Sequence, residues 1–329
     1  MNGYNASGVF ARFRRDRRAM LGLYILLAEL LLVLLLPPLM GLEPNVTDRA
    51  AGFWAAPSAR HWLGTDDVGR DLFARLICGG RISMLVGFAA AAISVAVGVP
   101  LGLIAGYRRG AWEFCIMRCA EVFQSFPSIV LVLCMVAVVG ASVWNIILVI
   151  GLLGWTSVAR LVYGNTLSVR EKEYIQAVRA LGGSTATVLR RNVLPNVVSP
   201  VWAALSQRVG RAILSESSLS FLGVGIRTPQ ASWGNMIQYA TNPAVFAGKP
   251  WVWLPPGLCI VATVIALQFV GDGLRDALDP KWAPACAAEQ PLVCRDTPEE
   301  LLREVDGASH SGLLGRGMST KRMSADQIT

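Results

Sequence analysis

The most informative pattern of residue types lies in a polar loop at 169–196, VREKEYIQAVRALGGSTATVLRRNVLPN. Apolar residues recur there at three- and four-residue steps, namely Tyr174, Ala177, Val178 and Leu181. This spacing predicts a short helix over 171–181 with one apolar face. Gly182-Gly183 can end this helix because glycine tolerates the left-handed conformation, and Ser184 can cap a second helix.

The second helix is expected to run to about Asn192 and to end at Leu194-Pro195. The loop is therefore predicted to be a helix–turn–helix with an apolar stripe in polar surroundings. Such a stripe needs a partner. It packs either as an amphipathic hairpin on a membrane surface or against another protein.

Patterns that mark enzymes are missing from the sequence. No Gly-x-x-x-x-Gly-Lys-Ser/Thr loop is present, so this chain is not expected to bind ATP by itself. His61 and His310 are the only histidines and lie far apart, which leaves a metalloprotease or a Ser/His hydrolase without support. The seven cysteines have no metal-ligand or disulfide spacing. We expect the chemistry of this protein to be conformational.

The elements that position this loop are predicted to be membrane spans. Hydrophobic residues make up 53% and charged residues 16% of the 329-residue chain, which is a poor match to a soluble domain. Six apolar runs are each near the roughly 20 residues that a spanning helix needs, at about Met20–Met40, Ile82–Ala105, Phe123–Ala141, Trp144–Tyr163, Val197–Phe221 and Trp253–Val270. No small-x-small cleavage site follows the first run, so it is interpreted as a retained anchor.

The basic residues predict the orientation of the spans. Lys and Arg are concentrated before the first run, between the second and third, and in the 169–196 loop, and such loops stay cytoplasmic. Six spans then place both termini in the cytoplasm and segment 42–81 outside. The net charge of +8 belongs to this hydrophobic part, which argues against nucleic-acid binding.

Segment 64–84, GTDDVGRDLFARLICGGRISM, carries glycines and paired charges. Gly64, Gly69, Gly79 and Gly80 permit tight turns, and Asp66/Arg70 and Asp71/Arg75 have helical i,i+4 spacing. We expect a structural lid or short helix at the outer mouth. The oxygen ligands of a calcium loop are absent, so metal binding is not expected.

The 169–196 loop resembles the cytoplasmic "EAA" loop of ABC-importer permeases, in which Glu-Ala-Ala, Gly and Leu-Pro hold the places of Gln176-Ala177-Val178, Gly182 and Leu194-Pro195. The chain departs from that pattern at Gln176, Val178 and Asn192. Glu173, one turn before Gln176, is the carboxylate that remains available. Six further stretches resemble the C-type permease subunit of the dipeptide/oligopeptide/nickel group, and they lie within 64–84, 98–107, 117–128, 214–225, 228–236 and 273–280.

The resemblance implies an all-α integral membrane protein with six transmembrane helices, the type I permease fold and a cytoplasmic coupling helix. The expected organisation is a cytoplasmic N-terminus, first transmembrane helix and extracytoplasmic segment at 1–81, followed by a five-helix permease core at 82–281. The polar cytoplasmic tail at 282–329 lies outside the resemblance, and its composition predicts disorder with one short helix at 298–304. The implied coupling residues are Glu173, Gln176, Ala177, Val178, Gly182, Leu194 and Pro195.

The resemblance also implies partners in a bacterial inner membrane: a second permease subunit, two cytoplasmic ATPases that bind ATP and Mg²⁺, and an extracytoplasmic solute-binding protein. The expected solutes are di- or oligopeptides, with nickel or a metal chelate as the alternative. An ion-coupled secondary transporter is the competing class, and a membrane-embedded hydrolase is a weaker one.

Polar residues inside the apolar runs are expensive in lipid and so are candidate functional residues, namely Glu29, Arg208, Arg211, Glu216 and Gln268. Arg208, Arg211 and Glu216 are predicted to line an aqueous pathway for a zwitterionic peptide. The alternative is a buried ion pair or a contact with the partner permease.

Overall fold

The computed structural model describes residues 6–182 and 184–278. Apart from isolated β-bridges in the 42–71 loop, the regular structure of this part is helical. Its long elements are α2 (Arg17–Met40), α3 (Leu72–Arg108), α6 (Val143–Arg170), α9 (Leu194–Phe221) and α12 (Pro250–Leu278). The predicted tail at 282–329, with its short helix at 298–304, lies outside the described residues.

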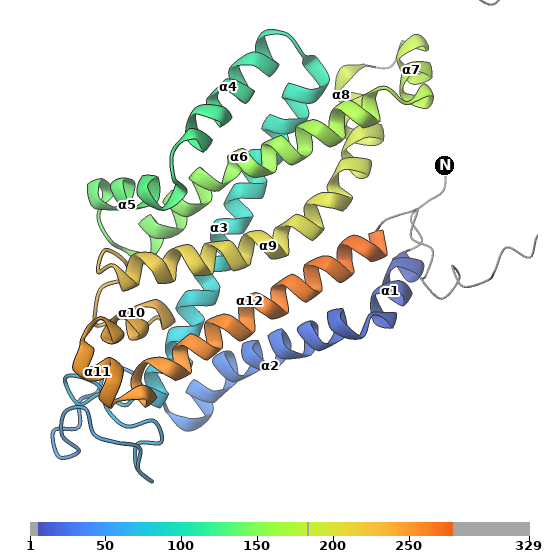
Figure 1. Ribbon diagram of the computed structural model, residues 1–329. Helices are drawn as coiled ribbons and strands as arrows, with labels where there is room; N and C mark the ends of the chain where they lie inside the picture. Colours follow the sequence, from blue (N-terminus) through green and yellow to red (C-terminus); the bar gives the residue numbers. More distant parts are fainter. Residues whose placement is uncertain (1–5, 183, 279–329) are drawn as a thin grey trace, which may run out of the picture. The chain divides into compact units, whose positions relative to one another are not determined.

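Shorter helices complete the described part. They are α1 (Ala6–Arg15), α4 (Ala111–Ser125), α5 (Ser128–Val139), α7 (Glu173–Ala180), α8 (Thr185–Val188), a π-helical turn η1 (Leu189–Val193), α10 (Trp233–Ile237), a 3₁₀ turn η2 (Gln238–Thr241) and α11 (Pro243–Gly248). Figure 1 shows α1, α7 and α8 at one end of the long helices, with α10, α11 and the 42–71 loop at the other.

Within residues 6–182 and 184–278, four helices are long and apolar enough to cross a membrane: α2, α3, α6 and α12. The bent pair α4 and α5 raises the number to five if it forms one span. The fifth predicted span, Val197–Phe221, lies in α9, which has 28 residues but is more polar, because it carries two arginines and a glutamate within its apolar run. It packs against α3, α6 and α12.

The third spanning helix, predicted over about Phe123–Ala141, is not one continuous helix. The chain bends by 91° between α4 and α5. Pro127 restricts the preceding residue to extended conformations, and Phe126 has φ −97° and ψ 145°. The 12 residues of α5 extend only about 18 Å, which is short of a bilayer core of roughly 30 Å.

Glycines set the close packing of α3 against α6. Gly98, Gly102 and Gly106 recur every fourth residue and therefore lie on one face of α3. A Cβ atom at Gly102 would lie 2.5 Å from the carbonyl oxygen of Ala159, and one at Gly106 would lie 2.6 Å from Cβ of Thr166. Small residues let two membrane helices approach this closely, so the pair forms a rigid centre for the other helices.

Trp233 of α10 joins the helices at the end that carries α10, α11 and the 42–71 loop. It is 2% exposed, its indole Nε1 donates to the carbonyl of Leu76 at 3.0 Å, and its backbone N–H donates to Oγ of Ser83 at 3.1 Å. A Cβ at Gly80 would lie 2.8 Å from the indole ring. Gly79 and Gly80 therefore serve close packing inside α3, where tight turns were predicted.

Candidate functional site

The hairpin at 171–193 is anchored by apolar residues on the inner side of α7. Ile175 is fully buried in a cluster that includes Val169 at the end of α6 and Val188 and Val193 of the following turns. Val178 packs at the edge of the same cluster. The two ends of the hairpin are therefore tied to the spans that enter and leave it.

The opposite side of α7 is apolar and exposed. Leu181 is 88% and Tyr174 42% exposed, and Ala177 between them is exposed as well. The single apolar face predicted for this helix is in fact two faces, because Val178 turns inward beside Ile175. Sequence reasoning missed Ile175, although it lies three residues before Val178 and so fits the same helical period.

The turn after α7 follows the predicted chemistry. Gly182 has φ +81°, in the left-handed region that favours glycine, and the Ser184 hydroxyl accepts the backbone N–H of Thr187 at 3.3 Å. The expected helix end at Leu194-Pro195 was wrong. Instead, α8 continues through the π-helical turn η1 into α9, which begins with Leu194 and Pro195.

Polar contacts hold the start of α7. The amide of Gln176 donates to the carbonyl of Glu171 at 3.1 Å, and Asn196 donates to the Tyr174 hydroxyl at 3.2 Å. Arg109, just after α3, lies 3.8 Å from Glu171 in an exposed and therefore weak ion pair. Glu173 stands in the first turn of α7, where the helix dipole favours a carboxylate.

A second candidate region is a cavity of about 560 Å³ at the bend between α4 and α5, bounded by α6 and α9. Arg208 and Arg211, one turn apart on α9, both line it. Its remaining wall is largely apolar and includes Phe126, Leu131 and Leu153. Two of the three predicted pathway residues therefore share one cavity.

Arg208 is held in place at the wall of this cavity. Its guanidinium nitrogens lie 3.5 Å from Oγ of Ser157 and 3.4 Å from Oγ of Ser94. A Cβ atom at Gly154 would lie 1.9 Å from Nη2 of Arg208, so only glycine leaves room for this guanidinium. Its buried Nε has no hydrogen-bond partner among the described residues.

Glu216 does not line that cavity. It is fully buried on another face of α9, among four serine hydroxyls. Ser220 and Ser232 donate to Oε1 at 2.8 and 2.9 Å, and Ser83 and Ser217 are 3.4 and 3.5 Å from Oε2. The hydroxyls of Ser83, Ser220 and Ser232 each also accept a backbone N–H, from Trp233, Ile226 and Asn235. The carboxylate thus joins α3 and α9 to the segment that carries α10.

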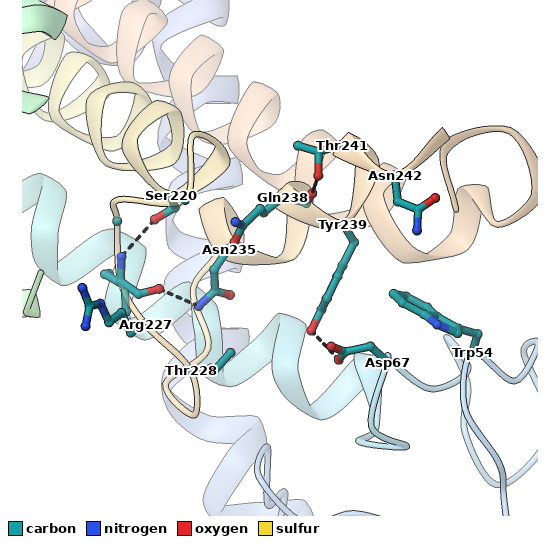
Figure 2. Close-up of a pocket in the computed structure, with 13 residues that line it drawn as sticks. Trp54, Asp67, Ser220, Arg227, Thr228, Asn235, Gln238, Tyr239, Thr241 and Asn242 are labelled. Carbon is teal, nitrogen blue, oxygen red and sulfur yellow. Dashed lines mark hydrogen bonds between the residues drawn. The ribbon is translucent and has the colours of Figure 1, made fainter. Parts of the chain in front are cut away.

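A pocket of about 500 Å³ lies between the 42–71 loop and residues 220–242, and Trp54, Asp67 and Tyr239 are among the residues that line it. Figure 2 shows Tyr239 directed at Asp67, to which its hydroxyl donates at 2.9 Å. Trp54 packs edge-on against Tyr239 at 5.2 Å between ring centroids. Burial and the charges of Asp66 and Asp67 raise the pKa of Tyr239, so its hydroxyl stays protonated as a donor.

Charges in the 42–71 loop pair differently from the sequence expectation. Asp66 binds Arg70 at 2.7 Å, as the i,i+4 spacing predicted, but Arg75 also turns to Asp66, at 3.5 Å. Asp71 caps α3 instead, through the backbone N–H of Ala74 at 2.9 Å. Among the described residues no group of His, Cys, Asp and Glu is arranged to hold a metal ion. This loop is therefore held by its own ion pairs and hydrogen bonds at the end of the helices that carries α10 and α11.

The long apolar helices, the exposed hairpin between α6 and α9 and the cavity lined by two arginines are features of a multi-span membrane transport protein. Two family models match the chain. The binding-protein-dependent transport system inner membrane component matches residues 98–284, and the N-terminal transmembrane domain of oligopeptide transport permease C matches residues 7–57.

Similar proteins with curated names agree with these matches. A protein of Brucella suis named as a peptide permease is 40% identical over 82% of this chain and 89% of its own length. The dipeptide transport system permease protein DppC of Alkalihalophilus pseudofirmus is 37% identical over 83% of this chain and 88% of its own. The glutathione transport system permease protein GsiD of Pectobacterium atrosepticum is 41% identical over 68% and 74%.

A solved structure supports the fold. A chain of the methionine ABC transporter MetNI, in an inward-facing conformation, matches 62% of this chain and 96% of its own length with a TM-score of 0.52 and 18% identity. This chain belongs to the family of binding-protein-dependent transport system inner membrane components. It is a multi-pass inner-membrane permease subunit of an ABC importer, a class in which separate subunits hydrolyse ATP.

Proposed function

We propose that this chain is one of two transmembrane subunits that form the pathway of an ATP-driven importer for peptides. An extracytoplasmic binding protein delivers the peptide, and two cytoplasmic ATPases supply ATP and Mg²⁺ chemistry that this chain does not perform. The names of the similar proteins, which cite peptides, dipeptides and glutathione, support this class of solute.

The observation that carries the proposal is the exposed apolar face of α7, formed by Tyr174, Ala177 and Leu181. Exposed apolar area on a helix between two spans favours burial in a groove of a partner protein. We assign that groove to an ATPase subunit. Glu173 and Gln176 flank this face, so they lie at the edge of the assigned contact.

The remaining predicted coupling residues have a structural part in the proposal. Val178 packs the hairpin against its own helices, Gly182 closes α7, and Leu194 and Pro195 start α9. Because α8 runs into α9 as one helical segment, a tilt of the docked hairpin is transmitted directly to α9. A rigid-body exchange between two packings of this kind switches the pathway between inward- and outward-facing states.

The proposed orientation has both termini and α7 in the cytoplasm. The basic residues of α1 and of the 169–196 loop support it, since Arg and Lys are retained on that side. The positions of α1 and α7 at the same end of the long helices in Figure 1 fit this topology. The pocket between the 42–71 loop and η2 then faces the binding protein.

Affinity purification of the tagged chain from its native membrane tests the partners. We expect a second permease and ATPase subunits to co-purify. In proteoliposomes containing that complex and the binding protein, peptide uptake should require ATP and should survive an ionophore that abolishes ion gradients. Uptake that follows an imposed ion gradient without ATP would overturn the proposal in favour of a secondary transporter.

A further inference from the structure

The cavity at the α4–α5 bend carries positive charge that the described part of the protein leaves unneutralised. None of the described carboxylates lies within ion-pair distance of Arg208 or Arg211. Glu216, the nearest carboxylate along α9, has its oxygens occupied by serine hydroxyls. Two unpaired guanidinium groups inside a membrane protein are costly, so the site is built to meet an anion from outside the chain.

The two arginines have different surroundings. Arg208 is fixed between Ser94 and Ser157 beside Gly154, whereas Arg211, one turn further along α9, is exposed. One guanidinium is therefore preorganised at the cavity wall and the other is accessible. Such a pair suits a carboxylate, whose two oxygens accept charge-assisted hydrogen bonds from guanidinium donors.

We propose that this cavity binds the C-terminal carboxylate of the transported peptide, with Arg208 and Arg211 as its ligands and the apolar wall at Phe126 and Leu131 receiving the adjacent side chain. The inference rests on the proposed function, because it concerns the solute of that same pathway. A carboxylate is common to all peptides with a free C-terminus, so the site recognises the solute class and leaves the choice of sequence to other groups.

The test measures charge selectivity inside the cavity of the assembled complex. Ser215 also lines the cavity, so Ser215→Cys in a variant lacking the seven native cysteines places one thiol there. The thiol is reacted with an anionic sulfonatoethyl and a cationic trimethylammonioethyl methanethiosulfonate. Each rate is divided by the rate of the same reagent at Asn242→Cys, at the exposed residue that caps the start of α11. We expect a preference of about 10-fold or more for the anionic reagent, as a focused field raises local anion concentration.

Trialanine and trialanine amide serve as matched probes. Trialanine should slow the anionic reaction, and trialanine amide, which lacks the carboxylate, should not. Arg211→Gln should abolish both the charge preference and the protection, and Arg211→Lys should keep the preference. Equal rates for the two reagents, equal protection by both peptides, or no reaction with either reagent would overturn the proposal.

ATP-driven uptake by the same proteoliposomes separates this inference from the proposed function. If ATP-driven peptide uptake is intact but the cavity shows no charge preference, only the carboxylate site is wrong. If charge-selective protection by trialanine persists but no peptide is taken up, the site stands and the proposed peptide importer falls.

Discussion

Replacement of Glu216 by alanine should destabilise the outer end of the helix bundle. In the native protein Oε1 accepts hydrogen bonds from Ser220 and Ser232 at 2.8 and 2.9 Å, and the side chain is fully buried. Removal of the carboxylate leaves both hydroxyl donors without an acceptor. Each hydroxyl also accepts a backbone N–H, Ser220 from Ile226 and Ser232 from Asn235, which holds both hydroxyls beside the emptied position.

The size of the effect follows from these two donors. A buried donor left unpaired costs about 1–3 kcal/mol, so Glu216→Ala should lose about 2–6 kcal/mol. At about 2.1 cal/mol/K of unfolding entropy per residue, 1 kcal/mol shifts the midpoint of thermal denaturation of a chain of this size by about 1.5 °C, so the midpoint should fall by at least about 3 °C. The measurement is the loss of monodisperse purified complex with temperature in detergent.

Two variants control this experiment. Glu216→Gln keeps one oxygen acceptor in the same place and should lie between wild type and Glu216→Ala. Ser218→Ala, on the exposed side of the same helix, removes only a hydroxyl bonded to its own backbone and should change the midpoint little. A Glu216→Ala complex as stable as wild type would refute the reasoning, since the serine hydroxyls would then not need the carboxylate.

Three further predictions use other parts of the fold. Gly102→Ala should lower the free energy of unfolding by about 1–3 kcal/mol, because its Cβ would lie 2.5 Å from the Ala159 carbonyl oxygen. Gly164→Ala in α6, where a Cβ meets nothing within 4 Å, is the matched control. Equal thermal midpoints for the two variants would contradict the packing argument. Gly182→Val should cost about 1–2 kcal/mol, because Gly182 has φ +81°, and should reduce transport and coupled ATP hydrolysis more than membrane insertion. Gly182→Asn should have a smaller effect, and unchanged transport in the valine variant would contradict the prediction. A reporter enzyme that works only outside the cytoplasm should be active when fused after Ala59, and one that works only in the cytoplasm should be active when fused after Ala308. The reverse result would mean an inverted topology.

Sequence patterns were sufficient for the features that depend on local spacing. The apolar runs located α2, α3, α6 and α12 because a bilayer fixes the length of hydrophobic helix that can cross it. Gly182 and Ser184 were predictable because turn and cap chemistry involves only neighbouring residues.

Features that depend on distant partners were not predictable. The cage around Glu216 joins Ser83 to residues more than a hundred positions further along the chain, so no local spacing reveals it. The bend at Phe126 and Pro127 had a signal in the proline, but a proline alone does not tell a kinked span from two helices. Gly79 and Gly80 were assigned to turns because glycine has no single structural meaning. Their place in α3 is explained by distant neighbours, the backbone of Ala231 and Ser232 at Gly79 and the indole of Trp233 at Gly80.

The pathway prediction was limited for the same reason. Arg208, Arg211 and Glu216 are close in sequence, yet a helix turns by about 100° per residue and so directs Glu216 away from the arginines. Positions 208 and 211 are one turn apart and share a face, which their spacing alone could have indicated.

The central claim, that α7 docks on an ATPase, is tested most directly by photocrosslinking from the exposed apolar face of α7. A benzophenone maleimide is attached to Ala177→Cys in a complex free of the native cysteines, and Val188→Cys, fully buried on the inner side of the same hairpin, is the matched control. We predict that illumination of membranes joins the Ala177 variant to an ATPase subunit, that the yield changes with nucleotide, and that the Val188 variant gives none of this product. The account is contradicted if Ala177→Cys in the assembled complex reacts freely with a water-soluble thiol reagent and forms no crosslink to an ATPase.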